Sequence, residues 1–296
     1  MNPTTAPAGL ARRLVIAAAV AAVLAVVVFL LAVHTVLGQR FDNAALLGSR
    51  SQGSGTRLGD ISLLRRITVD SFVGALLLIV VLGLVRRRPR LGIGLAIAAA
   101  IAVVLTHVLR TGVLHRPFLV HSDTLYSANT FPSGHTATAL ACALALVVVS
   151  PPAWRGISAV LAGSYAWITA AAVQTAGWHR PSDAIGAALL TFAVIALVTA
   201  AGAAWRPIGS ARRYGHLPAF AVLGVVWVVA GTLSALNAAR VLRFLVDHAD
   251  SFSPTQSVLN DAYLCSVNLT VVVVVTLLAA LLILLGPADL DQPNTR

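Results

Sequence analysis

The stretch Thr-Phe-Pro-Ser-Gly-His at residues 130–135 lies between two long apolar runs, which places it at a membrane boundary. Ser133 and Gly134 lead into an Ala- and Leu-rich run that begins near His135 and is typical of a helix. A glycine-containing turn before a helix directs several backbone N–H groups at one point, which favours the binding of an anion. His135 lies in the first turn of this helix, where its imidazole can pass a proton to a bound group.

Two further stretches carry charged and titratable residues of the same kind. Arg110 and Arg116 lie upstream, and a proline follows Arg116. Downstream, residues 179–183 read His-Arg-Pro-Ser-Asp, so His179 and Asp183 are four residues apart. This spacing is about one helical turn, which allows a carboxylate to orient an imidazole and stabilise its charged form.

The composition indicates a membrane protein. The chain has 296 residues, of which 58% are hydrophobic and 10% charged, and its mean hydropathy is +0.88. A soluble domain carries about a quarter charged residues. The net charge of +11 comes from arginines in short loops between apolar runs, so we interpret them as topology determinants and anionic-lipid contacts, and we predict no nucleic-acid partner. The two cysteines, Cys142 and Cys265, fall at or inside apolar runs and indicate neither a disulfide framework nor a metal site.

The hydrophobic pattern predicts an all-α membrane protein, a polytopic bundle of eight spans. Each apolar run is near the about 20 residues that a helix needs to cross the hydrocarbon. The runs lie at residues 14–37, 69–85, 91–109, 135–150, 157–176, 184–203, 218–238 and 267–285.

The segments between the runs are polar. We predict a disordered tail at residues 1–11, an amphipathic interfacial helix within 38–68, a basic loop at 205–217 and a polar loop at 239–265.

Arginine placement sets the predicted orientation. With the N-terminus in the cytoplasm, eleven arginines face the cytoplasm and ten face the opposite side. Leaving out the three near the polar motifs gives eleven against seven, and the cluster at 86–90 lies in a short loop, where the positive-inside rule is strongest. We therefore predict that both termini are cytoplasmic. An odd number of spans precedes each polar stretch, so all three are expected on the extracytoplasmic face.

The polar stretches resemble the three signature motifs of the type 2 phosphatidic acid phosphatase (PAP2) superfamily. The matching residues are Arg116-Pro117, then Pro132-Ser133-Gly134-His135, then His179 with Asp183. The resemblance covers about residues 60–205. It predicts an N-terminal tail at 1–11, a first transmembrane helix with an interfacial segment at 12–68, a six-helix PAP2-like core with its motif-bearing part at 69–205, and two additional transmembrane helices with a tail at 206–296.

The sequence departs from the family pattern in two places. The first family motif is Lys, six residues, then Arg-Pro, whereas here position 109 is Leu and Arg110 is separated from Arg116 by five residues. The third family motif begins with Ser-Arg, whereas here those positions are Ala172 and Val173. In the family that arginine holds the phosphate, so the second departure bears directly on activity.

Phosphoester hydrolysis needs a nucleophile, an acid for the leaving oxygen and cations for the phosphoryl oxygens. We predict His179 as nucleophile, Asp183 as the carboxylate that orients it, and His135 as the acid; the resemblance implies the same roles. Arg116, Arg110 and the backbone N–H groups of Ser133 and Gly134 are the predicted phosphate ligands. Arg180 either supplies the missing positive charge or is an interfacial anchor. No cofactor or metal is predicted.

The leading hypothesis is a metal-independent hydrolase of a lipid phosphate or diphosphate, acting through a phosphohistidine at the outer face of a bacterial inner membrane. Its substrate partner is a membrane lipid in the bilayer, and the oligomeric state stays open. A phosphotransferase using the same site is one alternative. A catalytically impaired lipid-binding membrane protein is another, because Val173 replaces the motif arginine. A transporter is disfavoured because the interiors of the predicted spans are nearly free of charge.

Overall fold

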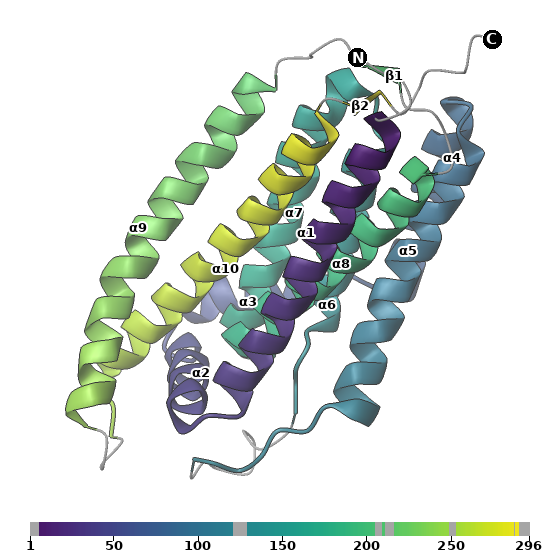
Figure 1. The fold of residues 1–296 in the computed structure, drawn as a ribbon. Helices are drawn as coiled ribbons and strands as arrows, with labels where there is room; N and C mark the ends of the chain where they lie inside the picture. The colour runs from purple at the N-terminus through teal and green to yellow at the C-terminus, as the bar shows by residue number, and fades with distance from the viewer. Residues whose placement is uncertain are drawn as a thin grey trace.

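The structure is a computed structural model that describes residues 6–120, 129–204, 209–210, 216–248, 253–286 and 288–289. Most of the predicted basic loop at 205–217 and of the C-terminal tail lies outside the described residues. The described chain is a bundle of ten α-helices with short irregular helical turns (Figure 1). The predicted all-α polytopic bundle is thus confirmed, with one small addition: a two-residue antiparallel pair joins β1 (Gly209–Ser210) to β2 (Ala288–Asp289).

Eight of the ten described helices follow the predicted apolar runs, and the other two lie mostly within the predicted polar segment at 38–68. They are α1 (Ala6–Val28), α2 (Val36–Ser49), α3 (Ser54–Leu64), α4 (Val69–Val85), α5 (Pro89–Val108), α6 (Gly134–Val149), α7 (Arg155–Thr175), α8 (Pro181–Ala204), α9 (Leu217–Asp247) and α10 (Gln256–Leu285). The π-helical turns η1 (Phe29–Val33) and η2 (Leu109–Val113) continue α1 and α5, and the 3₁₀ turn η4 (Pro152–Trp154) precedes α7.

All eight predicted apolar runs lie in helices. Six described helical segments are long and apolar enough to cross a membrane, which makes the chain a multi-pass membrane protein. The other two are shorter, with 17 residues in α4 and 16 in α6, and α4 forms a pair with α3 that is bent by 59°. Helix α1 begins and α10 ends at the same end of the bundle (Figure 1), as an even number of crossings requires.

Two predicted boundaries of polar segments are wrong. Helix α1 begins at Ala6, inside the predicted tail, because Leu10 and Leu14 are buried in the core of the bundle. The predicted polar loop at 239–265 is mostly helical, since α9 continues to Asp247 and α10 begins at Gln256. The added turns carry Val241 and Leu245, which pack against α2.

The segment at 38–68, for which an interfacial helix is predicted, contains most of α2. Helix α2 is largely buried and packs along α10. Ala44 and Ala45 contact Ala262 in one buried cluster, and a Cβ on Gly48 would overlap the Leu259 carbonyl of α10. Small residues let two helices approach this closely, and the contact fixes α2 against the bundle.

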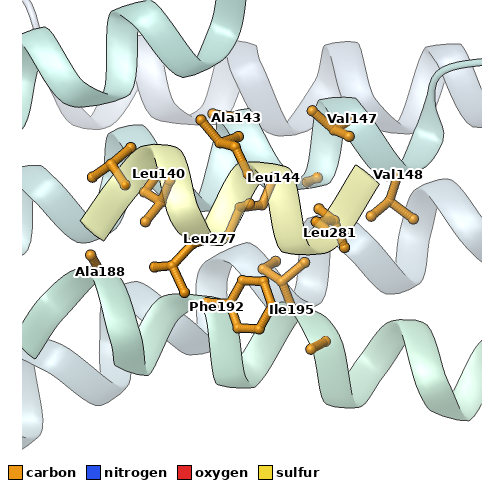
Figure 2. Packing of buried hydrophobic residues seen from close by; sticks show 14 of the residues in the cluster. Leu140, Ala143, Leu144, Val147, Val148, Ala188, Phe192, Ile195, Leu277 and Leu281 are labelled. Carbon is orange, nitrogen blue, oxygen red and sulfur yellow. The ribbon is translucent and has the colours of Figure 1, made fainter. Parts of the chain in front are cut away.

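Helix α10 belongs to the core, although the sequence predicts it as an addition to a six-helix unit. Figure 2 shows Leu277 and Leu281 of α10 among Leu144 of α6 and Phe192 and Ile195 of α8. A Cβ on Gly163 of α7 would lie 2.5 Å from the Leu278 side chain, so α7 and α10 are in close contact. Helix α9, by contrast, packs mainly against α10 and lies at the edge of the bundle (Figure 1).

Candidate active site

Four segments meet at the end of the bundle that holds α2. They are α2 itself, η2 with Arg110 and the loop after it that carries Arg116, the turn at residues 129–135, and residues 178–183 at the start of α8. All the site residues predicted from the sequence lie on the last three segments. The first segment was not expected to contribute.

His179 and Asp183 form the predicted pair. His179 Nδ1 lies 3.2 Å from Asp183 Oδ2, and the backbone N–H of Arg180 donates to the same oxygen at 2.9 Å. His179 is 6% exposed and Asp183 is fully buried. Pro181 begins α8, where a proline loses no helical hydrogen bond, and this start fixes the turn between the two residues. With Nδ1 as the donor to the carboxylate, Nε2 carries the lone pair.

The turn at residues 129–135 is anchored to both neighbouring segments. Ser133 caps α6, because its Oγ accepts from the Thr136 backbone N–H at 3.4 Å. Asn129 Nδ2 donates to the carbonyls of Arg110 at 3.0 Å and Leu114 at 2.8 Å, which ties the turn to the loop after η2. Asn129 therefore helps to bring the first and second motifs together.

The Ser133 backbone N–H, a predicted phosphate ligand, already has an acceptor within the protein. It donates to the Asp183 carbonyl oxygen at 2.9 Å and so joins the start of α6 to the start of α8. A phosphate oxygen cannot use this N–H without breaking that bond. Gly134 at the first position of α6 remains the predicted backbone ligand on this turn.

His135 and Arg110 lie beside the same turn. The His135 ring is half-buried and lies 5.4 Å from the Trp178 ring, centroid to centroid. A Cβ on Gly134 would lie 3.9 Å from Arg110 Nη1, which locates the guanidinium next to the turn. His179 and Arg110 are both near enough to His135 to act electrostatically on it. Both histidines and this cation are thus brought together.

Arg116 and Arg180 are both buried. Arg116 Nη1 and Nη2 each lie 3.3 Å from Asp42 Oδ2, in an ion pair whose side chains are 3% and 1% exposed. Arg180 Nε donates to Asn43 Oδ1 at 3.2 Å, and its Nη1 donates to Thr130 Oγ1 at 3.0 Å. Arg180 is 2% exposed, so it lies within the protein, and its role as a phosphate ligand stays a prediction.

Val173, at the position of the family arginine, lies in an apolar contact. It is fully buried with Leu64 of α3, Ala176 and Ala184. Its carbonyl oxygen accepts from the backbone N–H of His179 at 3.1 Å, so the residue supports the turn that carries His179.

The sequence prediction missed Asp42 and Asn43 on α2. Asp42 Oδ2 also accepts from Ser182 Oγ at 2.6 Å, and Oδ1 accepts from the Ser182 backbone N–H at 3.3 Å. Burial raises the pKa of Asp42 to about 6, assisted by the nearby Asp183 and opposed by Arg116, the Ser182 hydrogen bond and Arg180. One signal was visible: Gln39, Asp42 and Asn43 share one face at helical spacing, three and four residues apart.

No group of three or more His, Cys, Asp or Glu side chains in the described ranges is arranged to hold a metal ion. The polar groups that meet at the site are instead imidazoles, guanidinium groups, carboxylates and amide or hydroxyl side chains.

The fold and site define a polytopic helical membrane protein with a buried His–Asp pair beside buried arginines. Residues 90–207 match the model of the PAP2 superfamily, which confirms the predicted resemblance and supports membership of a phosphatase-type superfamily. This match includes all three motifs and covers less than half of the chain; α2 lies outside it. Neither the curated proteins nor the solved structures gave a match to the chain.

Proposed function

We propose that the protein is a phosphatase that hydrolyses a lipid phosphate or diphosphate through a phosphohistidine on His179. The observation that carries the proposal is the buried His179–Asp183 pair with His135 and Arg110 near it. The helices long and apolar enough to cross a membrane support a lipid substrate, since they bring the candidate site close to the bilayer.

The proposed reaction has two steps. His179 Nε2 attacks phosphorus and forms an N–P bond while the bond from phosphorus to the lipid or leaving-phosphate oxygen breaks. A protonated His135 gives its proton to that oxygen. A water molecule then attacks the phosphohistidine, His135 takes the proton from the water, and inorganic phosphate leaves with His179 restored. Asp183 holds the imidazole and stabilises its positive charge in both steps.

The cations stabilise the charge that develops on the phosphoryl oxygens. Arg110, Arg116 and Arg180 all lie on the segments that meet at the site, and each guanidinium has five N–H donors in a planar fork. Five donors exceed what one or two protein acceptors use, so a guanidinium that is held in this way can also bind phosphate. Arg180 is the proposed replacement for the motif arginine that Val173 lacks. This chemistry uses side chains alone and requires no metal.

The experiment is phosphate release by the purified protein in detergent micelles. We expect release from phosphatidic acid or from an isoprenoid diphosphate in the presence of EDTA, and an acid-labile phosphoprotein on rapid quenching. If the protein binds the lipid phosphates tested but releases phosphate from none of them, the lipid-binding alternative is favoured. The apolar contact at Val173 is the observation that motivates this alternative. Transfer of the phosphoryl group to an added alcohol in preference to water favours the phosphotransferase.

Both termini are proposed to be cytoplasmic, with the site at the extracytoplasmic face of the cell membrane. Ser253 precedes α10 at the site end, and Ala153 lies between α6 and α7 at the opposite end; both are exposed. In intact cells a membrane-impermeant thiol reagent is expected to label Ser253→Cys and to leave Ala153→Cys unlabelled.

The unsubstituted chain, whose cysteines lie within α6 and α10, is the control for background labelling. Labelling of Ala153→Cys without Ser253→Cys reverses the orientation and moves the site to the cytoplasm.

A further inference from the structure

Two adjacent residues of α2 each contact a different site arginine. Asp42 pairs with Arg116, which the first motif contributes, and Asn43 accepts from Arg180, which follows the nucleophile candidate. Asp42 also accepts two hydrogen bonds from Ser182 in the first turn of α8. No part of α2 is within the PAP2 match.

The position of α2 is itself fixed by the rest of the bundle. Its other side packs on α10, where Gly48 lies against the Leu259 backbone and Ala44 and Ala45 meet Ala262. Gln39, one turn before Asn43, donates from Nε2 to the carbonyls of Val33 and Pro117, both at 2.7 Å. The second of these bonds holds the residue that follows Arg116. Helix α2 is thereby bound to the loop of the first motif, to α8 and to α10.

We propose that α2 is a positioning element of the anion site, in which Asp42 sets the guanidinium of Arg116 and Asn43 sets that of Arg180. The inference rests on the proposed binding of phosphate at this site. It gives α10 a function, because α10 supports α2 and so holds the two residues that contact these arginines. A buried guanidinium without such an acceptor loses a charge-assisted hydrogen bond and its fixed orientation.

The proposal states that Asp42 acts through Arg116 and that Asn43 acts through Arg180. Double-mutant cycles test whether each pair is coupled in this way. The measurement is the dissociation constant for orthovanadate, a phosphate analogue, by calorimetry on the purified full-length protein. Asp42→Ala and Asn43→Ala are each expected to weaken binding about 10-fold, the loss from about one charged hydrogen bond. In the Arg116→Ala background, adding Asp42→Ala should change the constant less than about threefold, and Asn43→Ala should behave likewise in the Arg180→Ala background.

The crossed combinations serve as matched controls. Asp42→Ala with Arg180→Ala, and Asn43→Ala with Arg116→Ala, should multiply their separate effects to within about threefold. Asp261→Ala, which removes an exposed ion pair with Arg240, should leave vanadate binding unchanged. If Asp42→Ala does not fold, Asp42→Asn keeps the size and one acceptor oxygen of the side chain, and it should weaken binding in the wild-type background but not in the Arg116→Ala background.

The outcomes separate this inference from the proposed function. The positioning role is overturned if matched and crossed pairs show equal coupling, or if the α2 variants do not change vanadate binding. If the protein still hydrolyses a lipid phosphate in either case, the proposed phosphatase activity stands. If vanadate binds with the expected coupling in the matched pairs but no lipid phosphate is hydrolysed, the positioning role is supported and the proposed phosphatase activity is overturned. A wild-type protein that neither binds vanadate nor releases phosphate overturns both.

Discussion

Replacing His179 by alanine is expected to abolish phosphate release, with kcat lowered by about 10⁴-fold or more, while the protein still folds and inserts. The reason is that the variant lacks the nitrogen that forms the N–P bond of the proposed intermediate. The imidazole is almost completely buried and its Nδ1 lies 3.2 Å from Asp183, so folding of the variant is checked alongside activity. Phosphate release per mole of detergent-purified protein, with chromatographic elution as the folding check, gives the measurement.

Asp183→Asn extends the same test. The asparagine keeps the shape of the side chain but cannot stabilise a charged imidazole, and it can favour the wrong tautomer. An orienting aspartate elsewhere contributes about 10⁴-fold to kcat, so we expect a loss between about 10²- and 10⁴-fold. His248→Ala is the matched control, since this exposed histidine stacks on Phe244 and follows α9, a helix that carries no predicted site residue. Full activity in His179→Ala would falsify the nucleophile assignment.

Arg180→Ala is expected to have the second largest effect, a loss of about 10- to 100-fold in kcat/KM. Arg180 donates to Asn43 and Thr130 from a buried position next to His179, so it can supply the charge that the third family motif places at position 173. Arg180→Lys keeps the charge without the planar fork and should fall between alanine and wild type.

Val173→Arg provides the opposing test. Because Val173 is fully buried among Leu64, Ala176 and Ala184, an arginine there would bury a charge in apolar surroundings. We expect no gain in turnover and a lower melting temperature in detergent. The opposite result would be a gain in turnover from Val173→Arg and unchanged turnover in Arg180→Ala. It would show that position 173 faces the phosphate and would contradict the proposal that Arg180 replaces the motif arginine.

Several features of the fold could be predicted from the sequence because they depend on local patterns. The length of an apolar run measures whether a helix can cross the hydrocarbon, so every predicted run proved to be helical. The residues at which the helices begin and end were less predictable. The prediction of a polar loop from residue 239 is wrong, because Val241 and Leu245 form a buried strip that packs with residues of α2 and α10.

The same distinction applies to the candidate site. His179 and Asp183 are one turn apart in the chain, so their approach follows from helical geometry alone. Gly134 next to Arg110 depends on how the turn at 129–135 is held, and the bond from the Ser133 N–H to Asp183 could not be foreseen because these residues are 50 positions apart.

The sequence by itself predicted that this chain crosses a membrane, named His179 and His135 as the candidate nucleophile and acid, and showed that Val173 lacks the charge of its family counterpart. Only the tertiary structure decided that α2 enters the site, that Arg180 is buried there, and that α10 is part of the core. The physical reason is that partners such as Asp42 and Arg116, or Asn43 and Arg180, are separated by 74 and 137 residues. Contacts over that distance depend on how whole helices pack, which no local spacing of residues encodes.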